Sequence, residues 1–144
     1  MKPLVPEPDP NAALRAERLI SASPTRVFAA FEDPQSLARW WGPEGFTNTF
    51  QEFSFLPGGR WVFVMHGPDG TDYSNACVFR EIQPSSLVVI DHVTAPLFTL
   101  TVSLEAAGDA TRLIWVQQFE TAALAARLRP VCDPANEQNL DRLE

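Results

Sequence analysis

The chain has 144 residues, of which 45% are hydrophobic and 20% are charged, and this predicts one globular domain rather than a disordered chain. Its net charge is −7 and its Lys and Arg residues are scattered, which excludes a basic nucleic-acid-binding surface and an electrostatic membrane anchor. The two cysteines, Cys77 and Cys132, have no metal-binding or redox spacing, which is typical of reduced thiols in a cytoplasmic protein.

Proline dominates the N-terminal stretch. Four of the first ten residues are prolines, which excludes the apolar core of a signal peptide and predicts a flexible lead-in over residues 1–11. No later apolar run approaches the roughly 20 residues that a membrane-spanning helix needs. Residues 12–144 show no repeat and no linker, so we expect them to form a single domain.

One strand and two short helices are predicted next. Residues 13–20 alternate loosely between apolar and polar side chains, as a half-buried strand does. Ser23-Pro24 and Asp33-Pro34 each place an N-cap residue before a first-turn proline, so each opens a helix. The second helix stops at Gly42-Pro43. The apolar positions of the two helices are Val27, Phe28, Phe31, Leu37, Trp40 and Trp41.

Between residues 46 and 120 the apolar period changes from near 3.6 to 2, which indicates strands. Short turns rich in Gly, Pro, Asp and Ser separate the alternating runs, so we expect six strands that pair antiparallel as a meander. The residues that share strand faces are Trp61, Phe63 and Met65; Tyr73, Asn75, Cys77 and Phe79; Phe98, Leu100, Val102 and Leu104; and Leu113, Trp115, Gln117 and Phe119.

The C-terminal stretch has a helical pattern that two prolines interrupt. A straight helix through Pro130 and Pro134 would cost about 3 kcal/mol or more at each proline, because each lacks the backbone N–H and crowds the preceding turn. Asp133-Pro134 has the form of a new N-cap and first turn. We therefore expect either two helices, over about 121–129 and 134–143, or one helix with a bend above roughly 20°.

A series of short strings along the chain resembles one bacterial family. They are Ala38-Arg39-Trp40-Trp41-Gly42-Pro43, Gly45-Phe46, Pro57-Gly58-Gly59-Arg60-Trp61, Phe63-Val64-Met65-His66-Gly67-Pro68-Asp69-Gly70, Phe79-Arg80-Glu81-Ile82 and Asn136-Glu137-Gln138-Asn139-Leu140-Asp141-Arg142-Leu143. In this order they resemble the activator of Hsp90 ATPase homologue 1-like family (AHSA1, also called SRPBCC), over roughly residues 14–143. Each string alone is weak, and the combination is specific.

The resemblance implies the helix-grip fold of the Bet v 1-like and START-type superfamily. Its fold class is α+β, with a curved antiparallel sheet of about seven strands around a long C-terminal helix and two short helices after the first strand. The predicted order of elements agrees with this fold. The family implies an uninterrupted final helix, so Pro130 and Pro134 predict a kinked helix and a differently shaped roof over the cavity.

No catalytic, metal-binding or cofactor-binding pattern stands out. His66 precedes the turn at residues 67–70 and is better explained as a turn-stabilising residue than as a general base. Asp91 and His92 are adjacent in a predicted strand, so their side chains point to opposite faces and form no acid–base pair. The two histidines lack clustered cysteines or carboxylates, so we expect no metal site, and no nucleotide-binding or nucleophile motif predicts a cofactor.

The architecture predicts a cavity, because a sheet bent around a helix leaves space between its concave face and that helix. Asn75 and Gln117 lie on otherwise apolar faces, where an unpaired amide would cost on the order of 1–3 kcal/mol, so each needs a protein, water or ligand partner. The residues predicted to line the cavity are Trp40, Phe63, Met65, Tyr73, Asn75, Phe79, His92, Phe98, Trp115, Gln117 and Phe119.

Three functions are compatible with these features, and the sequence favours the first. The first is a module that binds a small apolar or aromatic molecule without catalysis. The second is a cofactor-free enzyme like the polyketide cyclases of the same superfamily, which needs at least two of Tyr73, Glu81 and His92 on the cavity wall. The third is a protein-interaction module, including an Hsp90-type co-chaperone, and rests on analogy alone. The sequence does not identify the ligand or the oligomeric state, and a homodimer is one possibility. No nucleic-acid or membrane partner is expected.

Overall fold

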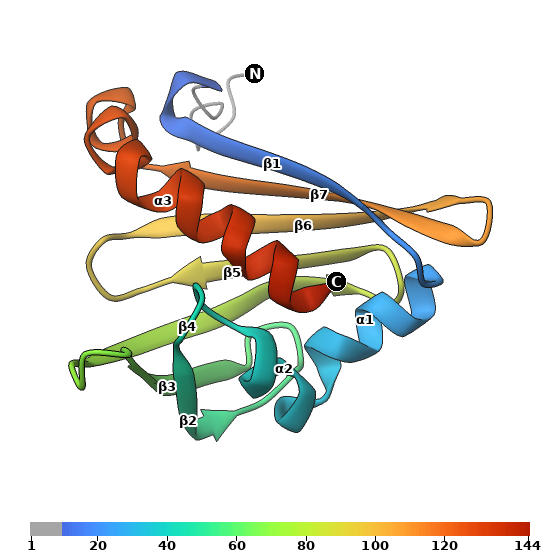
Figure 1. The fold of residues 1–144 in the computed structure, drawn as a ribbon, viewed down its shortest axis with the longest axis horizontal. Helices are drawn as coiled ribbons and strands as arrows, with labels where there is room; N and C mark the ends of the chain where they lie inside the picture. The colour runs from blue at the N-terminus through green and yellow to red at the C-terminus, as the bar shows by residue number, and fades with distance from the viewer. Residues whose placement is uncertain (1–9) are drawn as a thin grey trace.

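The computed structural model describes residues 10–144, which form one antiparallel sheet and three α-helices (Figure 1). Residues 1–9 of the predicted lead-in lie outside the described part of the chain, whereas Pro10–Ala12 form a short 3-10 helix, η1, in which Ala12 is fully buried. The other elements are β1 (Ala13–Ile20), α1 (Pro24–Glu32), α2 (Pro34–Trp40), β2 (Thr47–Phe53), β3 (Arg60–His66), β4 (Asp72–Gln83), β5 (Leu87–His92), β6 (Phe98–Ala107), β7 (Ala110–Phe119) and α3 (Ala122–Leu143).

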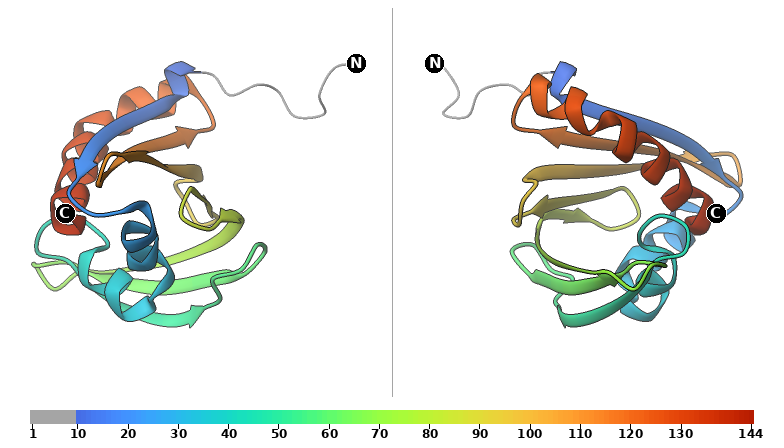
Figure 2. Two further views of the ribbon diagram at one scale, coloured as in Figure 1. Left: turned by 90° about the vertical axis from the view of Figure 1, so that its right-hand side faces the viewer. Right: turned by 60° about the vertical axis from the view of Figure 1, so that its left-hand side comes forward.

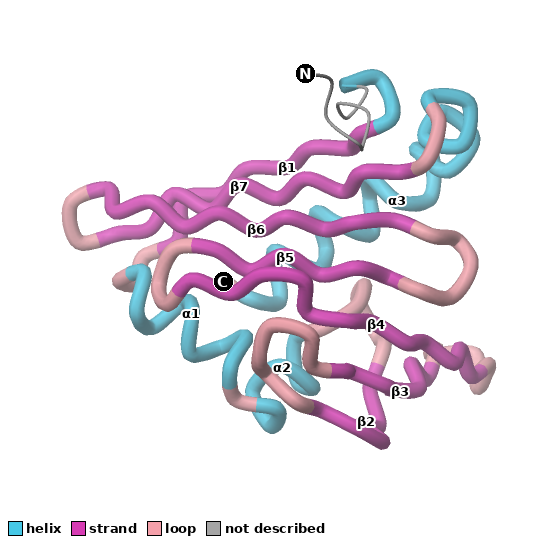
Figure 3. The backbone as a smooth tube through the Cα atoms, turned by 180° about the vertical axis from the view of Figure 1, so that it is seen from behind, coloured by secondary structure: helices cyan, strands magenta, loops and turns pink. Residues whose placement is uncertain are grey.

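The sheet has seven strands in the order β1-β7-β6-β5-β4-β3-β2, and every neighbouring pair is antiparallel. Strands β2 to β7 follow one another as the predicted meander, and β1 pairs with β7 from Ala13 opposite Gln118 to Ile20 opposite Thr111. Figure 2 shows the sheet curving around the helices, and Figure 3, from behind, shows the strands in front of all three helices. The predicted α+β helix-grip architecture is confirmed.

The two short helices begin where the sequence predicts. Ser23 Oγ accepts the backbone N–H of Arg26, and Asp33 Oδ1 accepts that of Gln35, so both side chains act as N-caps. Each helix places its apolar side chains against the concave face of the sheet. The buried residues of the two helices are Val27, Phe28, Phe31, Leu37 and Trp40.

Aromatic residues fill most of the core. Trp61 has no exposed surface, and its ring stacks on Phe63 with a centroid separation of 4.3 Å and on Phe79 with one of 5.9 Å. A smaller cluster of Leu14, Phe119 and Ala125 lies beneath the start of α3. The sheet is therefore densely packed at two places along its concave face.

The structure excludes one of the two predicted forms of the final helix. α3 is one continuous helix through Pro130 and Pro134, so the predicted division into two helices is wrong. Its N-cap is Thr121, and Asp133 lies inside the helix with Oδ2 3.6 Å from Nη1 of Arg129. Pro130 and Ala126 are both exposed, so water can bond to the Ala126 carbonyl that Pro130 cannot reach. Figure 1 shows the first turns of α3 almost end-on and its later turns crossing the sheet obliquely, so the helix changes direction along its length.

None of the helices in the described part of the chain combines the length and the apolar character of a membrane-crossing segment.

Candidate functional site

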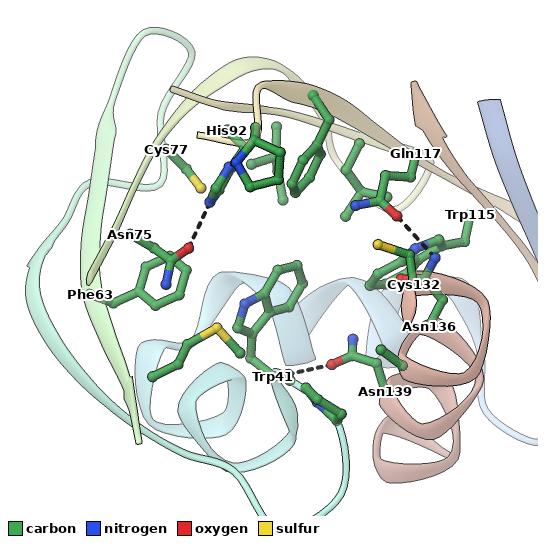
Figure 4. Close-up of a pocket in the computed structure, with 18 residues that line it drawn as sticks. Trp41, Phe63, Asn75, Cys77, His92, Trp115, Gln117, Cys132, Asn136 and Asn139 are labelled. Atoms are coloured by element: carbon green, nitrogen blue, oxygen red, sulfur yellow. Dashed lines mark hydrogen bonds between the residues drawn. The ribbon is translucent and has the colours of Figure 1, made fainter. Parts of the chain in front are cut away.

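A pocket of about 260 Å³ lies between the concave face of the sheet, α3 and the loop after α2 (Figure 4). Strands β3 to β7 form one wall, and α3 together with the segment from Trp41 to Pro43 forms the other. None of the lining residues is Asp, Glu, Lys or Arg. The pocket therefore suits an uncharged, largely apolar occupant.

Seven of the eleven residues predicted from the sequence line this pocket. Strand alternation brought them to one face, as expected for inward-pointing positions on a curved sheet. They are Phe63, Met65, Asn75, His92, Phe98, Trp115 and Gln117.

Four predicted residues lie elsewhere. Trp40 packs against Phe31 in the core, and its Nε1 donates to the Ala30 carbonyl at 2.9 Å. Phe79 belongs to the aromatic core around Trp61. The other two also lie outside the pocket: Tyr73 is 47% exposed, and Phe119 packs in the smaller cluster under α3.

The helix was expected to close the cavity, but the residues of α3 that line it were not predicted. Cys132, Ala135, Asn136 and Asn139 all line the pocket, and their spacing of three, four and seven residues places them on one helical face. Trp41 lines it as well, in the extended conformation that ends α2. The helical spacing was a usable signal in the sequence, but a face that mixes amides with small residues is not an apolar stripe.

The end of α3 holds the Trp41 loop in place. Arg142 Nη1 donates to the carbonyl oxygens of Trp41, Gly42 and Pro43 at 3.2, 3.1 and 3.0 Å. Asn139 Oδ1 accepts the backbone N–H of Gly42. Gly42 has a φ of +96°, a backbone conformation that favours glycine, and a Cβ at this position would displace the end of the Met65 side chain. Burial lowers the pKa of Arg142.

His92 and Asn75 form the main polar group on the sheet side of the pocket. His92 Nε2 lies 2.7 Å from Asn75 Oδ1, and Nδ1 lies 2.8 Å from the Pro96 carbonyl oxygen. Asn75 Nδ2 donates to the Tyr73 carbonyl at 3.0 Å. Burial lowers the pKa of His92, and the hydrogen bond with Pro96 opposes that shift only in part.

The polar group on the α3 side is an amide pair. Asn136 Nδ2 donates to Gln117 Oε1 at 3.1 Å, and the Gln117 side chain is buried, with 7% of the residue exposed. One of the partners that the sequence required for Gln117 is therefore a residue of the protein.

The chain matches a known protein family. A family model described as Activator of Hsp90 ATPase homolog 1-like protein matches residues 21–144. The chain belongs to this family. The resemblance seen in the sequence is confirmed. None of the curated proteins compared with the chain matches it.

Solved structures agree with this membership of the AHSA1-like family. A Nitrosomonas europaea protein is 17% identical over 94% of this chain and 93% of its own, with a TM-score of 0.86. An Arthrobacter aurescens protein is 24% identical over 92% and 84%, with a TM-score of 0.85. The AHSA1 protein of Silicibacter pomeroyi is 23% identical over 92% and 94%, with a TM-score of 0.74. These likenesses show the fold alone.

The titratable residues proposed for cyclase chemistry do not converge on the pocket of this AHSA1-like domain. Of the three candidates for cyclase chemistry, only His92 lines the pocket, and both Tyr73 and Glu81 are exposed. The pocket also holds two thiols, and burial raises the pKa of Cys77 to about 12 and raises that of Cys132 as well. Protonated thiols are poor nucleophiles. The pocket therefore lacks the two converging groups that the cyclase hypothesis requires.

His66 lies away from the pocket. Its Nδ1 is 2.7 Å from Asp72 Oδ1 and its Nε2 is 2.7 Å from Thr49 Oγ1, so the ring joins strands β2, β3 and β4 next to the turn, as predicted. Among residues 10–144, no group of three or more His, Cys, Asp and Glu side chains is arranged to hold a metal ion.

Proposed function

We propose that this protein binds a small, predominantly apolar molecule in the pocket between the concave sheet and α3. The observation that carries the proposal is a pocket of about 260 Å³, lined by no Asp, Glu, Lys or Arg, beside a core of interlocking aromatic rings. Protein interiors are close-packed, so a space of this size on an apolar wall is typical of a binding site.

The dimensions of the pocket limit the ligand. A dry apolar cavity of about 150 Å³ accepts benzene, so about 260 Å³ suits a molecule the size of a substituted naphthalene. Phe63, Ile90, Phe98 and Leu100 supply apolar contacts, and burial of apolar ligand surface on them provides the driving force at about 25 cal/mol per Å².

The proposal includes a cellular setting. Cys77 and Cys132 are both free thiols, which supports a reducing compartment such as the cytoplasm. A chaperone partner rests on analogy with the family name alone, and the proposal does not extend to it.

Filling the pocket from α3 tests the proposal. The probes are naphthalene, 2-ethylnaphthalene and 2-acetylnaphthalene, added during thermal unfolding. We expect at least one probe to raise the Tm of the wild type, because binding to the native state alone stabilises it. Ala135→Phe places a ring in the pocket and should abolish the shift, whereas Ala126→Phe, on the exposed face of the same helix, should retain it.

Two outcomes would contradict the proposal. One is that no probe raises the Tm or quenches the tryptophan fluorescence of the wild type. The other is that Ala135→Phe, folded by circular dichroism, binds a probe as tightly as Ala126→Phe does.

A further inference from the structure

We infer that the ligand of this pocket is a neutral molecule that carries a hydrogen-bond acceptor, such as a ketone or ester carbonyl oxygen, directed at the side-chain amide of Gln117. This inference rests on the proposed function and specifies the class of its ligand.

Gln117 presents an N–H donor that no described residue uses. Its Oε1 accepts from Asn136 Nδ2 at 3.1 Å, and in this arrangement Nε2 is the free end of the amide. Its Nε2 has no hydrogen-bonding partner among residues 10–144, although the residue is only 7% exposed and lines the pocket. Figure 4 shows the nitrogen end of Gln117 pointing into the pocket, away from Asn136. A ligand that fills the pocket without an acceptor would leave this donor unpaired.

Two further donors without partners lie on the same side of the pocket. Trp115 Nε1 and Asn139 Nδ2 are buried and make no hydrogen bond with residues 10–144, and both residues line the pocket. Figure 4 shows them with Gln117 on the α3 side. Both atoms are fully buried, so Gln117 Nε2 is the most accessible of the three donors to a ligand. This side of the pocket therefore has donors in excess over acceptors.

The sheet side of the pocket offers a ligand much less. His92 is engaged with Asn75 and the Pro96 carbonyl, and Asn75 also donates to the Tyr73 carbonyl. Phe98 and Leu100 continue the wall with apolar surface. The acceptor of the ligand is therefore directed to α3 and β7, and its apolar body lies against β3 to β6.

The absence of charge on the wall decides between a carbonyl and a carboxylate. The lining residues, all within the described part of the chain, include no Lys or Arg to pair with an anion. An unpaired buried carboxylate carries a desolvation penalty far above that of a neutral carbonyl, which needs only one donor. A cognate ligand of this pocket therefore binds as the neutral molecule.

The test compares 2-substituted naphthalenes of similar size that differ in the acceptor. They are 2-acetylnaphthalene, which has a ketone, 2-ethylnaphthalene, which has no acceptor, and 2-naphthoate, which is an anion at pH 7.5. Affinities are measured by quenching of tryptophan fluorescence, since Trp41 and Trp115 line the pocket. Gln117→Met removes the donor and keeps an unbranched side chain, and Gln118→Met makes the same change next to it on the opposite face of β7.

We expect the affinity ratio of ketone to hydrocarbon to fall by about 2- to 12-fold in Gln117→Met, the range for one neutral hydrogen bond. Comparing this ratio between the wild type and the variant cancels the difference in hydrophobicity between the probes. Gln118→Met should leave it unchanged, and 2-naphthoate should bind the wild type at least tenfold more weakly than the ketone. An unchanged ratio in Gln117→Met, or equal binding of naphthoate and ketone, overturns the inference.

An infrared measurement covers the case in which Gln117→Met does not fold. The carbonyl stretch of 2-acetylnaphthalene bound to the wild type should lie below its frequency in hexane, because a donor contacts the oxygen. A bound stretch at the hexane frequency overturns the inference while the proposed function stands. If neither the ketone nor the hydrocarbon binds the wild type, the proposed function fails and the inference fails with it.

Discussion

Nε2 of His92 lies 2.7 Å from Oδ1 of Asn75, while Nδ1 of the same ring lies 2.8 Å from the carbonyl oxygen of Pro96. Carbonyl oxygens only accept hydrogen bonds, so with the Asn75 amide in this orientation the ring would need to donate from both nitrogens, as only imidazolium can. Burial acts in the opposite direction and lowers the pKa of His92. The neutral ring keeps both contacts only if the Asn75 amide turns so that its nitrogen donates to Nε2.

The pH dependence of stability shows which effect dominates. Because its pKa is lowered in the folded state, His92 binds a proton more readily in the unfolded chain. The stability that the neutral His92 contributes is therefore fully present above the unfolded pKa of about 6.5 and is lost as the pH falls below that value. We expect the wild type to lose more unfolding free energy than His92→Gln between pH 7.5 and pH 5, measured by urea unfolding. A wild type that gains stability relative to His92→Gln over this range would show that the two acceptors keep His92 charged.

Arg142 is expected to hold the Trp41 loop against α3. Arg142→Met removes the Nη1 donor shared by three carbonyl oxygens and the Nη2 donor to Arg39 O at 2.6 Å. Because hydrogen bonds from a charged donor are strong, unfolding free energy should fall by about 1.5–3 kcal/mol. Arg142→Lys keeps the charge but lacks the planar guanidinium, so its unfolding free energy should lie between those of the wild type and Arg142→Met.

Denaturant unfolding measures these differences, and Arg127→Met supplies the control. Arg127 is exposed on the same helix, so its replacement should change stability by no more than about 0.5 kcal/mol. Equal losses in the two methionine variants would contradict an anchoring role for Arg142.

Pro130→Ala is expected to stabilise the domain. The substitution supplies a backbone N–H to the Ala126 carbonyl and removes the clash of the proline ring, at an exposed position that contributes nothing to the core. The gain should be up to about 3 kcal/mol, with a stronger helical circular dichroism signal. A loss of stability would mean that the change of direction in α3 is needed for its packing on the sheet.

Two aromatic residues of neighbouring strands should respond very differently to truncation. Trp61 has no exposed surface and contacts rings on several sides, so Trp61→Ala should lower unfolding free energy by about 3–5 kcal/mol. Tyr73 is 47% exposed, so Tyr73→Ala should cost less than about 1 kcal/mol and leave probe affinity unchanged. A large loss of probe affinity in Tyr73→Ala would indicate that Tyr73 contacts the bound probe.

Strand alternation predicted which face each residue lies on, but not its position along the strand. Tyr73, Asn75 and Phe79 share a face of β4, as predicted, yet only Asn75 reaches the pocket. β4 has 12 residues, more than the pocket spans, and a bulge between Phe79 and Glu81 shifts its pairing with β5. Which part of a long strand faces α3 depends on the curvature of the whole sheet, and local periodicity carries no information about it.

The helices show the same division between local and tertiary information. Ser23 and Asp33 are local signals, and both capped the helices that they predicted. Trp40 was predicted to line the pocket, but Trp41 lines it instead. Which of the two faces the pocket depends on the residue at which α2 ends, and the prediction was wrong by one position. Pro130 interrupts the backbone hydrogen bonds only locally, and the packing of α3 against β1 and η1 outweighs that cost.

The pairing of β1 with β7 has a consequence for how the chain acquires its structure during synthesis. Arg15 and Val116 are partners in the sheet although 101 positions separate them in the chain, so the first strand made has no neighbour until the last strand leaves the ribosome. Contacts this distant in sequence slow folding, because a long loop must close before they form. Until then both edges of β1 are unpaired, and its charged residues Arg15, Glu17 and Arg18 oppose its pairing with other nascent chains.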